Sequence, residues 1–120
     1  CEFCVGGSLA SCHAECLLKK APPISHATFV SRALAVADAM AYLHEQQVMH
    51  RDLKAQNVLI SAKGELQVGD FGLAKFAPRE KEQLTAETGS YRWMAPEVLR
   101  HEPYDQKCDV YSFAMLCWEM

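Results

Sequence analysis

Three short motifs that occur in a fixed order between residues 50 and 97 constrain this chain more than any other feature. They are His50-Arg51-Asp52-Leu53-Lys54-Ala55-Gln56-Asn57, Asp70-Phe71-Gly72 and Ala95-Pro96-Glu97. The first two motifs are separated by two short segments of strand composition, Val58–Ile60 and Leu66–Val68, which flank a loop ending in Gly64. Glycine can take the left-handed conformation that a tight hairpin needs. The pattern predicts a β-hairpin whose two ends bring polar side chains of the first and second motifs to one common ligand.

Size and composition indicate an ordinary globular protein. The chain has 120 residues, half of them apolar and 22% charged, with a net charge of −3 and a pI near 5.9. This balance gives no reason to expect nucleic acid or an anionic membrane as a partner. No apolar run approaches the roughly 20 residues that cross a bilayer, and no basic and apolar leader is present. We therefore expect one domain, no membrane insertion and a cytoplasmic location.

Helical spacing predicts three long helices. The first runs from Ser8, its N-cap, to Lys20, and the second runs from its N-cap Ser25 to about Gln47. The apolar stripe of the second helix is expected to face the core; it consists of Phe29, Ala33, Val36, Met40 and Leu43. The third helix, Cys108–Met120, is apolar almost all round, which is typical of a central, buried helix. The polar segment from Pro78 to Ser90 is expected to be a surface loop.

Four of the six cysteines lie within the first sixteen residues, which raises the possibility of a metal site. They are Cys1, Cys4, Cys12 and Cys16. Zinc ligands usually come in pairs on tight turns, whereas the second pair here lies in a predicted helix. Reduced thiols that pack as small apolar residues are the favoured interpretation. A redox or metal role for these four residues is left open.

Together, the three motifs resemble the catalytic domain of eukaryotic protein kinases, over nearly the whole chain. The string Leu53-Lys54-Ala55-Gln56-Asn57 departs from tyrosine kinases, yet Trp93-Met94-Ala95-Pro96-Glu97 is shared with them. This mixture resembles the tyrosine-kinase-like group of Ser/Thr kinases, which includes the mixed-lineage and Raf-like kinases. The resemblance implies an α+β, protein-kinase-like fold: a mainly helical C-terminal lobe with a short β-hairpin and without the N-terminal lobe.

The resemblance also implies a reaction, the ATP-dependent transfer of the γ-phosphate to a Ser/Thr hydroxyl of a protein substrate. Asp52 would accept the proton of that hydroxyl or orient it, and Lys54 would neutralise the transferred phosphoryl group. Ser90 would hydrogen-bond toward both side chains. Asn57 and Asp70 would bind Mg²⁺, a hard cation that prefers oxygen ligands. Phosphoryl transfer depends mainly on such positioning and charge neutralisation.

The start of the chain resembles the hinge of a kinase domain, where ATP binds. The backbone groups of Glu2 and Cys4 would hydrogen-bond the adenine edge, with Cys1 at the gatekeeper position. Leu9 and Leu59 would sandwich the adenine ring, supported by two residues of the last helix, Leu116 and Met120. Ser11 would contact the ribose.

Other residues acquire structural and regulatory roles from the same resemblance. Asp109 would hold the backbone of the first motif, and His50 would stack with Phe71. Arg51 is a fixed cation that is expected to be unpaired near the loop from Lys75 to Thr88. A phosphate placed by an upstream kinase on Thr85, Thr88 or Ser90 could therefore pair with it and order the loop.

Parts of a complete kinase domain are missing from these 120 residues: the Gly-rich loop, the strand lysine and the helix glutamate. We therefore expect a partial domain, with the hinge at residues 1–7 and the C-terminal lobe at 8–120, truncated in the last helix. The parent protein is predicted to be an active kinase, and residues 1–120 alone are predicted to be inactive. The alternative is a non-catalytic kinase-like scaffold or binding module. The substrate, the oligomeric state and dual specificity are left open.

Overall fold

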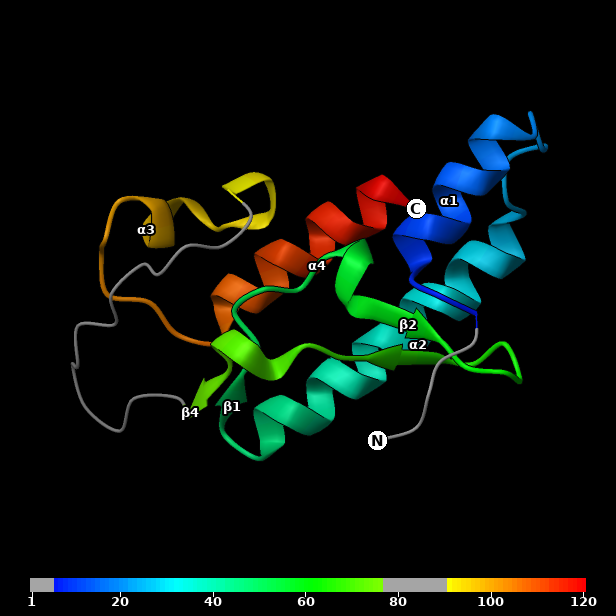
Figure 1. The fold of residues 1–120 in the computed structure, drawn as a ribbon. Coiled ribbons are helices and arrows are strands. Elements are labelled where there is room, and N and C mark those ends of the chain that lie inside the picture. Colours follow the sequence, from blue (N-terminus) through cyan, green and yellow to red (C-terminus); the bar gives the residue numbers. More distant parts are fainter. Residues whose placement is uncertain (1–5, 77–90) are drawn as a thin grey trace.

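The structure of the chain is a computed structural model that describes residues 6–76 and 91–120. Its helices and strands, in chain order, are α1 Leu9–Leu18, α2 His26–Glu45, β1 Val48–Met49, β2 Val58–Ile60, β3 Leu66–Val68, β4 Lys75–Phe76, α3 Pro96–Leu99 and α4 Lys107–Glu119. Figure 1 shows α2 and α4 running across the molecule, with the strands between them and α1 near the end of α4. The mainly helical architecture with a small strand pair confirms the predicted fold class.

The first two helices begin where their caps predict. The Ser8 hydroxyl accepts a hydrogen bond from the Ser11 backbone N–H, and Ser25 does the same for Thr28. Both helices end about two residues earlier than predicted. Lys20 and Gln47 have φ angles of 51° and 58°, a left-handed conformation that a right-handed helix cannot include.

The predicted hairpin is present, with Val58 opposite Val68 and Ile60 opposite Leu66. Gly64 has a φ of +81°, as the tight turn requires. A third segment lies along this hairpin, which the sequence did not indicate: the Ile60 N–H donates to the Gly7 carbonyl, and the Gly6 N–H donates to the Ile60 carbonyl. A Cβ atom at Gly6 would lie 2.7 Å from that carbonyl oxygen, so glycine permits the close approach.

A second small sheet joins β1 to β4, with Val48 opposite Phe76 and Met49 opposite Lys75. Sequence reasoning missed it because strands of two residues have no readable periodicity. The pairing brings the residue before His50 next to the segment that follows Phe71. The first two motifs are therefore tied together on both sides.

The main core cluster joins the helices to the hairpin. It contains Leu9, Val36, Met40, Leu53, Ala55, Val58 and Leu116. The apolar stripe of α2 faces this core as predicted, through Val36 and Met40. Among the described residues, no helix is both long and apolar enough to span a membrane.

The prediction that the last helix is buried all round is wrong for the part of the chain that the structure describes. Only one face of α4 is buried, and it includes the polar residues Asp109 and Ser112. Val110 is 58% exposed and Trp118 is 83% exposed. A helix packed against neighbours on one side covers positions three and four apart, whatever the apolar content of its other faces.

Candidate active site

A buried carboxylate holds the backbone of the segment from residue 50 to residue 57. Asp109, on α4, is 1% exposed and accepts hydrogen bonds from the backbone N–H groups of His50 and Arg51, each at 2.8 Å. The His44 Nε2 atom lies 2.9 Å from the same carboxylate. Arg51 has a φ of 69°, a conformation that costs roughly 1 kcal/mol for a non-glycine residue. The predicted anchoring role of Asp109 is confirmed.

The Asp52 carboxylate is held by two donors. Its Oδ2 atom accepts from Lys54 Nζ at 2.6 Å and from Asn57 Nδ2 at 2.9 Å. Asn57 Nδ2 also donates to the Asp52 carbonyl at 2.7 Å. The side chains of Asp52 and Lys54 are only 12% and 17% exposed. Two donors on one partly buried oxygen limit the rotation of the carboxylate, which is how a reacting group is oriented in advance.

Asn57 and Asp70 lie at the same end of the hairpin. Asn57 immediately precedes β2, and its carbonyl accepts from the N–H of Gly69, which immediately follows β3, at 2.8 Å. Asp70 comes next, with a φ of 60°, and its Oδ1 atom accepts from the Gly72 N–H at 3.3 Å. A Cβ atom at Gly72 would lie 3.2 Å from that oxygen.

These two residues fit a magnesium ion by their chemistry. The Asn57 amide turns its nitrogen toward Asp52, so its oxygen faces the other way. An amide oxygen and an exposed carboxylate are the hard ligands that Mg²⁺ prefers, alongside phosphate oxygens and water.

His50 connects the first motif to the second. Its Nε2 atom lies 3.0 Å from the Gly69 carbonyl, and its ring centroid lies 5.3 Å from that of Phe71. The rings are tilted by 54°, so they pack at an angle and not as parallel plates. Phe71 is 49% exposed in the described part of the chain.

Some of the residues predicted to form the ATP site lie within the described structure. Leu9 and Leu116 are buried in one core cluster, with Met120 packed against it, and Leu59 is half-buried. The Ser11 hydroxyl donates to the Ser8 carbonyl at 2.8 Å and accepts from its N–H at 3.0 Å, so it completes the cap of α1. The predictions for Cys1, Glu2, Cys4, Thr85, Thr88 and Ser90 lie outside the described residues.

Arg51 has partners within the structure, so the premise that it is an unpaired cation is wrong. One of its nitrogens lies 3.4 Å from the Leu73 carbonyl, and its guanidinium carbon lies 5.7 Å from the centroid of the Tyr104 ring. The pairing of Arg51 with a phosphate stays a prediction.

Sequence reasoning missed the contacts that tie the segment just before the third motif to α4. The Trp93 indole N–H donates to the Glu119 carboxylate at 3.0 Å, and the Ser112 hydroxyl donates to the Trp93 carbonyl at 2.6 Å. No local pattern marks partners that are 19 to 26 residues apart. Beside them is a recess of about 510 Å³, whose lining includes Gln56 from the first motif and Trp118 from α4.

The described cysteines include one with a strongly altered acidity. Burial, with the adjacent Asp109 carboxylate adding to it, raises the pKa of the Cys108 thiol to about 12. Such a thiol stays protonated and unreactive at neutral pH. Within residues 6–76 and 91–120, no group of three or more His, Cys, Asp or Glu side chains could hold a metal ion.

The model of the protein kinase domain matches residues 1–120. The serine/threonine-protein kinase STY46 of Arabidopsis thaliana is 41% identical over 119 residues, which are 99% of this chain and 20% of that protein. The serine/threonine-protein kinase VIK of the same plant is 44% identical over 127 residues, covering 99% of this chain and 28% of that protein.

An animal protein shows a similar match. The mitogen-activated protein kinase kinase kinase dlk-1 of Caenorhabditis elegans is 37% identical over 119 residues, 99% of this chain and 12% of that protein. The chain therefore spans between 12% and 28% of the length of these three relatives.

Proposed function

Because the chain belongs to the protein kinase domain family, within its tyrosine-kinase-like Ser/Thr group, we propose that the protein containing it transfers the γ-phosphate of ATP to a serine or threonine hydroxyl of a protein substrate. The observation that carries this proposal is the contact network of Asp52, in which Lys54 and Asn57 both donate to one carboxylate oxygen. Two relatives support it: one is named a serine/threonine-protein kinase in a plant, and the other a mitogen-activated protein kinase kinase kinase in a nematode.

The proposed division of roles follows from the charges. The oriented Asp52 carboxylate accepts the hydrogen bond of the substrate hydroxyl. It takes the proton as the hydroxyl oxygen bonds to the γ-phosphorus and the bond from that phosphorus to ADP breaks, so that ADP leaves. The Lys54 ammonium group lies beside that carboxylate, where it can neutralise charge on the transferred phosphoryl group. Ser90 is proposed to hydrogen-bond toward the same pair.

Protein kinases as a family use ATP and Mg²⁺. In this chain Asn57 and Asp70 would hold Mg²⁺, which when bound neutralises charge on the phosphate oxygens. The adenine is proposed to lie against Leu9 and Leu59, with the backbone of Glu2 and Cys4 at its edge. For Ser11 the support is weaker, because its hydroxyl already caps α1.

The decisive test is a pair of charge-neutralising substitutions in the full-length protein. Asp52→Asn is expected to lower kcat for phosphorylation of a protein substrate by roughly a hundredfold or more, since it removes the proton acceptor. Asp38→Asn, at an exposed position of α2, is the matched control and should leave kcat unchanged. Radiolabelled γ-phosphate transfer and ATP binding are measured together. A wild-type protein that binds ATP without transferring phosphate would instead support a non-catalytic scaffold.

Control by an upstream kinase is the regulatory part of the proposal. A phosphate on Thr85, Thr88 or Ser90 would add a strong acceptor for the Arg51 guanidinium, which now contacts a carbonyl and a tyrosine ring. Replacing Thr85 and Thr88 with alanine together is therefore expected to lower activity severalfold. If the double variant purified from cells is as active as the wild type, those two threonines have no such role.

A further inference from the structure

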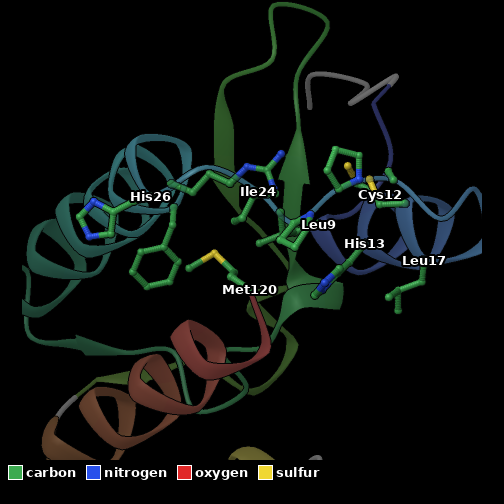
Figure 2. Close-up of a pocket in the computed structure, with 13 residues that line it drawn as sticks. Leu9, Cys12, His13, Leu17, Ile24, His26 and Met120 are labelled. Carbon is green, nitrogen blue, oxygen red and sulfur yellow. The ribbon is translucent and has the colours of Figure 1, made fainter.

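A pocket of about 530 Å³ lies between α1, the 21–25 segment, the start of α2 and the end of α4, and it shares only Leu9 and Met120 with the proposed adenine site. Figure 2 shows Leu9, Ile24 and Met120 gathered at its centre, with His13 and Leu17 on the α1 side and His26 on the α2 side. The volume is within the range of about 300–1,000 Å³ that small-molecule sites occupy. The proposed phosphoryl transfer assigns no role to the other lining residues of this pocket.

The pocket has an apolar floor. Leu9, Leu17, Ile24, Phe29 and Met120 all contribute to its lining. These side chains come from separate elements, so the floor is a product of the packing and not of one helix face. A ligand with a flexible or planar hydrocarbon body would displace water from this surface and gain contact with it.

The charged and polar side chains of the lining include no carboxylate. Arg32 supplies a guanidinium, and His13 and His26 supply imidazoles, while the described lining contains no Asp or Glu. Arg32 is half-buried and makes no hydrogen bond or ion pair with any other residue in the described ranges 6–76 and 91–120. The carboxylate of Glu15, which is also on α1, forms an ion pair with Lys19. A partly desolvated cation without a counter-charge is unfavourable, and a bound anion would relieve that.

Two thiols also line the pocket. Cys12 and Cys16 are free, half-buried and one helical turn apart on α1. They do not make a metal site, because no described cluster of His, Cys, Asp and Glu has the required number of ligands. A molecule bound in the pocket would cover both thiols and shield them from reagents.

We infer that this pocket binds a small organic carboxylate with an apolar body, such as a medium-chain fatty acid. The Arg32 guanidinium matches a carboxylate with two parallel N–H donors, and the apolar floor accepts the chain. A single guanidinium suits one negative charge, whereas the phosphates of a nucleotide would bring several negative charges. The ligand class is therefore an amphipathic monoanion.

The binding test compares three probes on the full-length protein by isothermal titration calorimetry: dodecanoate below its critical micelle concentration, dodecanol and dodecyltrimethylammonium. Dodecanoate should bind at least tenfold more tightly than the cation, with dodecanol between them. Arg32→Gln should weaken dodecanoate at least tenfold, while Arg100→Gln, at an exposed site on the end of α3, should leave it unchanged. Equal affinity for the anion and the cation, or no effect of Arg32→Gln, would overturn the inference.

Thiol protection on the wild-type protein gives a readout that needs no variant to fold. Dodecanoate should slow the reaction of Cys12 and Cys16 with iodoacetamide by at least fivefold, measured by mass spectrometry. Cys117 on α4 is outside the lining and should react at the same rate with and without dodecanoate. Unchanged rates at Cys12 and Cys16 would exclude this site even if dodecanoate bound elsewhere.

Discussion

Asp109 shows how much one buried side chain can determine about a site that it does not enter. Its two oxygens accept from two successive backbone N–H groups, and one of them lies 2.9 Å from a histidine nitrogen, so the buried carboxylate is stabilised by polar neighbours inside the protein. The His50–Arg51 backbone is thereby held in a conformation that a free chain would avoid, since Arg51 has a positive φ. The position of Asp52 depends on this constraint.

Asp109→Asn is therefore expected to loosen the 50–57 segment. An amide nitrogen facing a backbone N–H cannot accept, so at least one buried hydrogen bond is lost, at a cost of about 2 kcal/mol. The corresponding change in hydrogen exchange is a roughly thirtyfold faster rate for the His50 and Arg51 amides. Hydrogen–deuterium exchange with mass spectrometry of the full-length protein measures it, and Asp38→Asn is the exposed control. Unchanged protection of both amides would show that Asp109 does not hold this backbone.

At the scale of the elements, the β2–β3 hairpin places the second motif relative to the first. Its register sets Gly69 opposite Asn57, so that Asp70 follows directly at the same end. The turn at the far end uses Gly64 at a φ of +81°, with no other atom within 4 Å of where a Cβ would be. The turn therefore needs glycine for its backbone conformation and not for space.

Gly64→Ala is expected to destabilise the hairpin by about 1 kcal/mol, because an alanine in the left-handed region is strained. Gly64→Asn should have a smaller effect, since asparagine tolerates that region better. Exchange of the β2 and β3 amides should become roughly fivefold faster with alanine. If alanine and asparagine behaved identically to glycine, the turn would not have the conformation described.

Gly6 differs from Gly64, because at Gly6 a side chain would clash with a neighbouring segment. A Cβ at Gly6 would meet the Ile60 carbonyl at 2.7 Å, although the φ of Gly6 is not in the left-handed region. The close approach of residues 6–8 to β2 is what sets the start of α1 beside the hairpin.

At the scale of the whole molecule, the described residues form an elongated body with extents of 47, 27 and 23 Å. Its outer helix faces carry large apolar side chains, including Trp118 and Val110 on α4 and Leu18 at the end of α1. Exposed apolar surface of this kind favours association with other protein surfaces.

We expect the isolated 120-residue chain to self-associate through these side chains. Trp118→Gln should lower the association measured by analytical ultracentrifugation and leave the helix content unchanged in circular dichroism, because that side chain is 83% exposed. Leu116→Gln, at a fully buried position two residues away, should instead reduce the helix content. An identical sedimentation profile for wild type and Trp118→Gln would contradict the prediction.

Local features of this protein could be predicted from its sequence because their causes are local. Ser8 and Ser25 cap helices through backbone groups three residues away, and Gly64 permits its turn through its own dihedral angles. The order and spacing of the three motifs were likewise sufficient to predict the kinase family. Short-range hydrogen bonds and backbone sterics depend on few neighbours, so a single sequence contains the information for them.

Only the tertiary structure decided which faces are buried and which distant groups meet. The exposed side of α4, the partners of Arg51, the contact of Trp93 with Glu119 and the β1–β4 pairing all depend on residues far apart in the chain. The same holds for the pocket around Arg32, whose lining comes from separate elements. Burial and charge pairing are properties of the assembled fold, because a side chain gains a partner or loses water only after remote segments have packed against it.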